Sequence, residues 1–374
     1  MTVDLFEEAR RRLDAGHPTS ARELAGQALA AARAANASAG VARAAQLLGE
    51  CLFSIGDVAA AGELAKEAQR LDQERGDSAA LGADLNLLGV VEFTSGRVEE
   101  ALSLFRRSND LREESLGADD EETIESLNNV AVAMWHMGDK DESLATHEEA
   151  LRRCERALGE AHRRTAETLN ALAVKVATVP DEEQRSRDLH ERALAAAEAS
   201  LGPDSDLVAR LSINFASALI NAGDLERARP LVERGVALHV RHFGPGSRWT
   251  SFALDTQANL ASFEGRHGDA RAAFERSLVI RVDELGPEHP ETLDAATGLQ
   301  GALAELADED PGARDEGLGL YMMVASLQGV AYEGPIPAPA LPTRERAAEQ
   351  LRAYVARLRE RTAPDPIQVK DPAR

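Results

Sequence analysis

A two-residue break, Leu-Gly, returns along this chain at a nearly constant distance, and this repetition constrains the fold more than any other feature. The copies are Leu116-Gly117, Leu158-Gly159, Leu201-Gly202, the variant Phe243-Gly244, and Leu285-Gly286. Successive copies are separated by 42, 43, 42 and 42 residues. A period of this size indicates stacked supersecondary units, each packed only on its neighbours, rather than two or three globular domains.

Six of the units also carry a turn glycine that is followed, five residues later, by a small residue, and the fifth repeat has Pro180 and Ser186 at this place. The pairs are Gly16/Ala21, Gly56/Ala61, Gly96/Ala101, Gly138/Ser143, Gly223/Ala228 and Gly265/Ala270. Glycine suits the end of a helix because the chain there adopts a left-handed conformation. A second small residue stands twelve positions before the first, as Gly89 does before Ala101, so that two facing helices can approach closely. The pattern predicts one helical hairpin per unit and an all-α fold.

The spacing resembles the tetratricopeptide repeat (TPR), whose signature has Leu-Gly in the first helix and Ala and an aromatic residue in the second. Leu88-Gly89, Ala101 and Phe105 match that signature. The 42-residue period and the Leu-Gly-Pro connector resemble the kinesin light chain type, and residues 127–131, Leu-Asn-Asn-Val-Ala, look like its first-helix core. The resemblance implies a right-handed superhelical solenoid of stacked antiparallel hairpins, with seven to eight repeats, in a stand-alone bacterial form.

The repeat positions predict how the chain is divided. A TPR-like array spans 1–330, with looser 40-residue repeats over 1–78, 42-residue repeats over 79–290 and a degenerate repeat over 291–330. A Pro-rich linker over 331–342 follows, then an amphipathic helix over 343–361 and a disordered tail over 362–374. Three roles remain open for this last helix: it caps the array, it docks an acidic partner, or it occupies the groove.

Charge narrows the classes of partner. Lys plus Arg total 42 and Asp plus Glu total 64, a net charge of −22, which argues against binding to nucleic acid or an anionic membrane and favours a basic protein partner. No apolar run approaches the length of about 20 residues that a membrane span requires. The two cysteines, Cys51 and Cys154, form no disulfide framework and are typical of a cytoplasmic protein.

The resemblance places the first helices on the concave face of the solenoid. Residues i, i+4 and i+7 of a helix share one face, and asparagines recur there at intervals of 42 residues. Amides can both donate to and accept from a peptide backbone, and the family's first-helix asparagines contact extended cargo peptides. The predicted peptide-binding groove contains Asn86, Val90, Phe93, Asn128, Val132, Trp135, Asn170, Val174, Asn214 and Asn259. The alternative is that these amides bond to neighbouring backbone or to each other between repeats.

No catalytic, cofactor or metal site is predicted. His147 and His190 occupy second-helix positions where other repeats have Phe105 or Phe274, so they are interpreted as packing residues. His239 and His242 are two ligands where a zinc site needs about three. The resulting prediction is a non-enzymatic protein–protein interaction scaffold that binds an extended peptide in its groove. The alternatives are a regulatory sensor gated by its own C-terminal segment, and an enzyme or small-molecule-binding protein with a site inside the superhelix.

Overall fold

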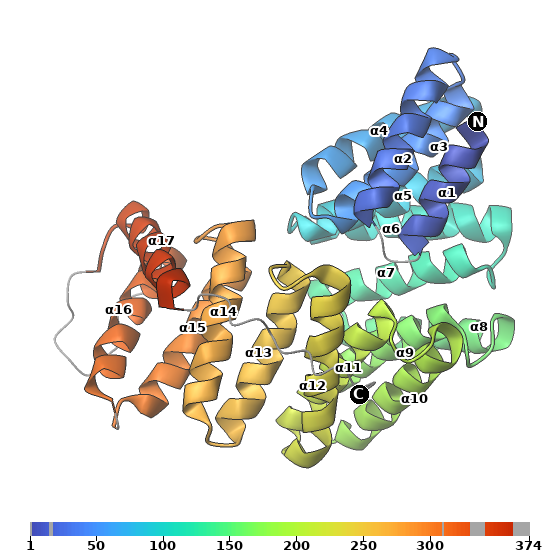
Figure 1. Cartoon of the computed structure of the whole chain (residues 1–374). Coiled ribbons are helices and arrows are strands. Elements are labelled where there is room, and N and C mark those ends of the chain that lie inside the picture. Colours follow the sequence, from blue (N-terminus) through green and yellow to red (C-terminus); the bar gives the residue numbers. More distant parts are fainter. Residues whose placement is uncertain (1, 15–17, 309, 330–340, 362–374) are drawn as a thin grey trace, which may run out of the picture. The chain divides into compact units, whose positions relative to one another are not determined.

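The computed structural model describes residues 2–14, 18–308, 310–329 and 341–361, which form seventeen α-helices and no strand (Figure 1). This confirms the predicted all-α fold. The chain divides into two compact units, Met1–Gly202 and Pro203–Arg374. None of the described helices combines the length and the apolar composition that crossing a bilayer requires.

The N-terminal unit consists of five helical hairpins, each with an odd-numbered first helix and an even-numbered second helix. Its helices are α1 (Thr2–Asp14), α2 (Pro18–Ala34), α3 (Ser38–Ser54), α4 (Val58–Arg75), α5 (Ser78–Thr94), α6 (Val98–Leu116), α7 (Glu121–Met137), α8 (Lys140–Ala157), α9 (Arg163–Val176) and α10 (Glu183–Leu201).

The C-terminal unit consists of three hairpins and a final single helix. Its helices are α11 (Asp206–Asn221), α12 (Leu225–Phe243), α13 (Arg248–Phe263), α14 (His267–Leu285), α15 (Pro290–Leu306), α16 (Pro311–Gln328) and α17 (Arg344–Arg361). The α15–α16 hairpin occupies 290–328, so the segment expected to be a degenerate repeat still forms two helices of ordinary length.

The Leu-Gly breaks act as connectors between hairpins. Gly117 and Gly286 end α6 and α14 with left-handed φ angles of +98° and +86°, which glycine adopts without strain. The following first helices then start on a side-chain cap: a carboxylate oxygen of Asp120 accepts from the Glu122 amide, and His289 Nδ1 accepts from the Glu291 amide. The glycine and the cap together fix where each hairpin stops and the next begins.

Within each unit the first helices form the inner layer of the stack. Consecutive first helices pack on one another, from α1 to α9 in one unit and from α11 to α15 in the other. Among the described helices, neighbouring second helices do not approach within 8 Å between Cα atoms. Their link is made by long side chains, such as Arg192 on α10, whose Nη2 lies 2.5 Å from Glu155 Oε1 on α8. A stack that is tight on one side and open on the other curves toward the first helices.

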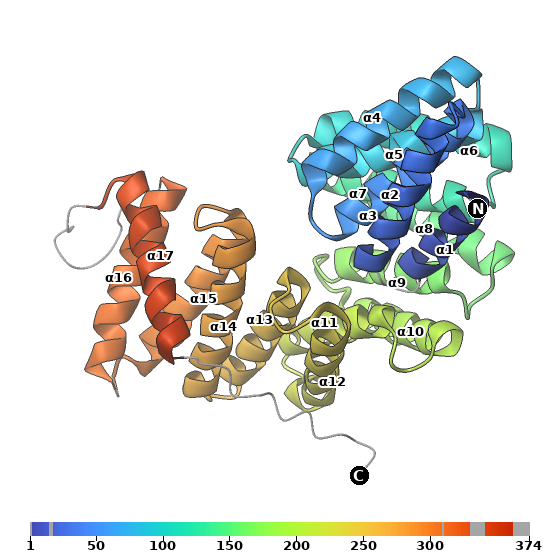
Figure 2. The same ribbon diagram turned by 45° about the horizontal axis from the view of Figure 1, so that its top comes forward.

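The last helix, α17, packs against the second helices α14 and α16 and against no other described helix (Figure 2). Leu351, Tyr354, Val355 and Leu358 form an apolar stripe on this helix, and all four are buried there. Thr343 Oγ1 accepts from the Arg346 amide at 3.4 Å, as expected for an N-cap. Of the predicted linker, only Leu341 and Pro342 are described, and the predicted tail over 362–374 lies outside the described residues.

The small residues at the hairpin crossings let side chains of the second helix lie directly on the first helix. A β-carbon on Gly89 in α5 would lie 2.5 Å from the ring of Phe105 in α6, closer than carbon atoms can approach. By contrast, nothing lies within 4 Å of a β-carbon built on Gly26 in α2.

We therefore expect Gly89→Ala to destabilise the protein by about 1–3 kcal/mol, because the methyl group overpacks the α5–α6 crossing. The matched control Gly26→Ala should instead stabilise it by about 0.5–1 kcal/mol, because alanine is the better helix former. Urea denaturation followed by circular dichroism measures both. Equal effects from the two substitutions would contradict a steric role for Gly89.

His147 in α8 and His190 in α10 are buried, with exposed fractions of 0% and 2%. They stand where α6 and α14 place the buried rings of Phe105 and Phe274. Burial lowers the pKa of both imidazoles to about 4, from a usual value near 6.5. Both are therefore neutral packing residues at neutral pH.

This depression predicts a loss of stability in acid. The unfolded chain binds protons near pH 6.5 while the folded chain resists until about pH 4, so the full stability exists above pH 6.5 and declines as the pH falls. The loss should reach about 3 kcal/mol for each histidine at pH 4. As the pH falls from 7 to 4, the double variant His147→Phe/His190→Phe should lose less stability than the wild type, measured by urea denaturation. A profile parallel to that of the wild type would refute this origin.

Candidate peptide-binding face

Eight of the ten predicted groove residues lie on three consecutive first helices of the N-terminal unit, α5, α7 and α9. These helices pack side by side in the inner layer. The other two, Asn214 on α11 and Asn259 on α13, belong to the C-terminal unit, where Asn214 is half-buried and Asn259 is exposed. A face within one unit can therefore contain the α5, α7 and α9 residues only.

The asparagines of this face are engaged between repeats. Asn86 is only 7% exposed, and its Oδ1 accepts from Asn129 Nδ2 of the next repeat at 2.9 Å. Asn170 is half-buried and also interacts with other residues.

Asn128 uses both ends of its amide inside the unit. Its Nδ2 donates to Thr168 Oγ1 on α9 at 2.7 Å, so its Oδ1 is the acceptor for His147 Nδ1 on α8 at 3.1 Å. Thr168 Oγ1 in turn lies 3.5 Å from the Sγ of Cys154 on α8. This chain of contacts ties two successive repeats together, and it is the inter-repeat bonding that the sequence left open as the alternative for these amides.

The apolar members of the face remain more accessible. Trp135 and Val132 on α7 are half-buried, and Val174 on α9 is 39% exposed. Val90 and Phe93 on α5 are half-buried against the core of the α5–α6 hairpin and α7. The Phe93 ring meets His136 edge-on, with 5.0 Å between ring centroids.

Two ammonium groups flank Trp135, and together the three residues form what we call the tryptophan–lysine site. Lys140 Nζ, at the start of α8, lies 5.3 Å from the ring centroid, and Lys175 Nζ, on α9, lies 5.4 Å from it. Both distances are within the range of a cation–π interaction. Burial lowers the pKa of Lys175, since desolvation disfavours its charged form.

Two lysines at one tryptophan ring are unusual within this chain. The sequence contains only four lysines, Lys66, Lys140, Lys175 and Lys370, and two of them meet at Trp135. Lys66 forms an ion pair with Glu63 at 2.9 Å. Among the described residues, no carboxylate oxygen lies within 4.0 Å of Lys140 or Lys175. The sequence interpretation passed over both lysines, although their rarity was a signal that it contained.

The remaining reactive side chains have local structural roles. The Nδ1 of His239 lies 2.8 Å from the Gly235 carbonyl oxygen, and the Nε2 of His242 lies 2.6 Å from that of Asp204. In the described part of the chain, no group of three or more His, Cys, Asp or Glu side chains could hold a metal ion. Burial raises the pKa of Cys51 to about 12 and also raises that of Cys154, so neither thiol is an activated nucleophile.

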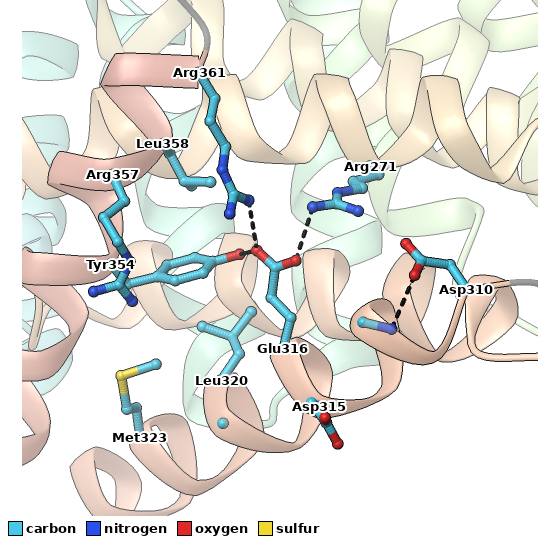
Figure 3. A pocket seen from close by; sticks show the side chains of 12 residues that line it. Arg271, Asp310, Asp315, Glu316, Leu320, Met323, Tyr354, Arg357, Leu358 and Arg361 are labelled. Carbon is cyan, nitrogen blue, oxygen red and sulfur yellow. Dashed lines mark hydrogen bonds and ion pairs between the residues drawn. The ribbon is translucent and has the colours of Figure 1, made fainter.

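A cavity of about 510 Å³ lies in the C-terminal unit between α14, α16 and α17 (Figure 3). Glu316 at its centre accepts from Arg271 at 2.8 Å, from the Tyr354 hydroxyl at 2.9 Å and from Arg361 at 3.4 Å. Burial raises the pKa of Tyr354, which keeps its hydroxyl protonated as a donor. The carboxylate is therefore already satisfied, and these contacts hold α17 on the hairpins below it.

Comparison with known proteins agrees with this repeat architecture. Two family models, both described as tetratricopeptide repeat, match the chain: one at 80–156 and 126–176, the other at 208–248 and 254–291. No curated protein sequence matches it.

Several solved structures are similar. The apo quorum sensor NprR from B. thuringiensis is 11% identical, with a TM-score of 0.61 and 87% of each chain covered. The Rap conjugation gene regulator of plasmid pLS20, solved in complex with the Phr* peptide, is 12% identical, with a TM-score of 0.57, covering 79% of this chain and 78% of that one. BtubC (BKLC) from P. vanneervenii is 22% identical, with a TM-score of 0.46, covering 65% and 93%.

At sequence identities this low, the similarity to these structures shows a similar fold and nothing about function. The repeat models, however, rest on the same hairpins that the connectors and crossings define, over both units. Both units of the chain therefore contain tetratricopeptide repeats, with a 42-residue period like that of the kinesin light chain type.

Proposed function

We propose that this protein is a non-enzymatic interaction scaffold that binds an extended segment of a partner protein along α5, α7 and α9. The observation that carries the proposal is the tryptophan–lysine site, where a half-buried indole on one first helix meets an ammonium group from the next. Tryptophan is a frequent anchor of binding energy at interfaces because it buries much apolar area with few rotatable bonds. Val132 and Val174 extend the apolar surface beside it.

We propose that the partner segment has an apolar side chain, which lies on Trp135, and an acidic side chain beside it. The net charge of −22 favours basic partners at long range, but charges in water are screened beyond about 8 Å at physiological salt. A segment that lies on Trp135 is closer than this to Lys140 and Lys175, and neither lysine has a carboxylate partner among the described residues. The local charge therefore decides which side chain can lie there, while the net charge acts on the approach.

Two further observations support a peptide-binding role. The Rap regulator with a similar fold was solved with a peptide bound. In addition, α17 packs on the second helices α14 and α16 and makes no contact with a described first helix of its own unit within 8 Å between Cα atoms. Cys51 and Cys154 are free and buried, in agreement with the cytoplasmic location that we propose.

The test uses two short fluorescein-labelled peptides of equal length, one alternating Glu and Leu and the other alternating Lys and Leu, measured by fluorescence anisotropy. We expect the acidic peptide to bind more tightly and Trp135→Ala to weaken it by about 2 kcal/mol, or roughly 30-fold. Lys175→Gln should weaken it several-fold and reduce the dependence on salt. Asn128 stays unchanged in these variants, because truncating it would break the contacts between repeats.

Matched controls come from the same chain. Trp249→Ala removes the only other tryptophan, which is 43% exposed on α13 in the C-terminal unit, and Lys66→Gln removes a lysine that is already paired. Both substitutions should leave binding unchanged. Every variant should also have the circular dichroism spectrum of the wild type. Tighter binding of the basic peptide would overturn the proposed partner chemistry, and equal losses from Trp135→Ala and Trp249→Ala would overturn the proposed site.

A further inference from the structure

A second unusual group of side chains lies at the junction of the second and third repeats. Asp84 on α5 is 1% exposed, and neither of its carboxylate oxygens has a hydrogen-bond donor among the described residues. Asp72 on the neighbouring helix α4 is 3% exposed, and its Oδ1 accepts from Arg75 at 2.6 Å. Two buried carboxyl groups on helices that pack together thus interact with each other, and the guanidinium of Arg75 contacts only the Asp72 member of the pair.

The groups around Asp84 supply no second cation. On α4 and its connector, Arg75 is shared between Asp72 and Asp77, which lies 3.2 Å from it. On α3, the carboxylate of Glu50 faces the same region and is paired with Arg10 at 2.5 Å. The charges that act most strongly on Asp84 through space, those of Asp72, Glu50 and Asp77, are all negative.

The other two helices that pack on α5 are α6 and α7, and the buried cation of α6 is directed to α7. Arg112 on α6 packs its side chain over Gly82 but donates to the Glu122 carbonyl and to Ser126. Glu125 on α7 pairs with Arg112 and with Arg164, each at 3.7 Å. Neither helix offers a donor to Asp84.

We propose that Asp84 and Asp72 share one proton in the folded protein, and that this protonated pair is a pH-sensitive lock between the second and third repeats. Two ionised carboxylates only repel each other, whereas a protonated carboxyl donates to an ionised one and satisfies a buried oxygen on each side. In the locked state the Asp84 hydroxyl donates to Asp72, which also accepts from Arg75.

The titration of the pair agrees with this arrangement. Burial first, and then the charge of Asp72, raises the pKa of Asp84 to about 8. Burial also raises the pKa of Asp72. Since the folded pKa of Asp84 lies above the unfolded value near 3.8, its contribution to stability is complete below pH 3.8 and is lost as the pH rises through 8. The junction should therefore loosen in mild alkali, opposite in sign to the effect of the buried histidines.

The consequence concerns α5 as a whole. This helix carries Asp84 toward α4 and also carries Asn86, which bonds to the next repeat, and Phe93 of the candidate face. Loss of the shared proton weakens the α4–α5 junction and leaves the α5–α7 contact in place. The first two repeats would then separate from the binding face as one piece, whatever ligand that face takes.

The decisive variant is Asp84→Asn, because its amide donates to an ionised Asp72 without a proton to lose. For the wild type, the unfolding equilibrium constant measured in urea should rise, relative to that of Asp84→Asn, by about tenfold for each pH unit between pH 5 and 8. Asp110→Asn, an exposed acid on α6, should keep the wild-type slope. Parallel wild-type and Asp84→Asn profiles would overturn the proposal.

A measurement on the wild-type chain keeps the test independent of how well the variant folds. Carbon-13 labelling of aspartate side chains reports each carboxyl titration by NMR, and Asp72→Asn assists the assignment. One buried aspartate should titrate near pH 8, and Asp72→Asn should lower that value, because it removes the neighbouring charge. If every aspartate titrates below pH 6, no proton is shared and the lock does not exist.

Discussion

Each hairpin of this chain covers apolar side chains of the preceding hairpin and supplies hydrogen-bond partners for its polar groups. The rest of the structure depends on these contacts between neighbouring hairpins. The buried arginines show this directly. Arg112 on α6 donates to the Glu122 carbonyl at 2.7 Å, and Arg281 on α14, 2% exposed, donates to the Glu291 carbonyl at 2.6 Å. In both cases the end of one second helix is tied to the first turn of the next first helix. Each of these guanidinium groups is buried only where the next hairpin packs on it, and that hairpin supplies the carbonyl oxygen that accepts from it.

The same dependence explains which parts of the fold the sequence could predict. Connectors and crossings are set by local rules: a left-handed glycine such as Gly117, a cap such as Asp120, and a small residue such as Gly89 beneath Phe105. These rules act within a few residues or one hairpin, so a period read from the sequence places the helices closely. Which side chains meet across repeats is decided by the rotation and tilt between hairpins, which no local rule contains.

The asparagines illustrate where such reasoning stops. The i, i+4, i+7 pattern predicted that Asn128 lies on an accessible face, yet its amide bonds to His147 and Thr168. The adjacent Asn129 is the residue that bonds to Asn86. A change of one helix position is a rotation of 100°, so a small error in the assumed face exchanges a ligand-binding amide for a structural one. The sequence offered both interpretations for these amides but held nothing to choose between them. Lys140 and Lys175 are separated by 35 residues and meet at Trp135 only because α7, α8 and α9 pack together.

Charge has a different meaning at each length scale of this protein. The net charge of −22 is spread over the surface of the whole chain, where salt screens it. At Trp135 the local sign is positive, and at Asp84 the buried negative charge is large enough to favour a proton over an ion. A stacked array makes such local reversals easy to maintain, because each repeat packs only on its neighbours and each junction has its own set of charged side chains. The net charge of the chain therefore affects how a partner approaches. The charges at single junctions determine which side chain can bind there and at what pH the repeats stay packed.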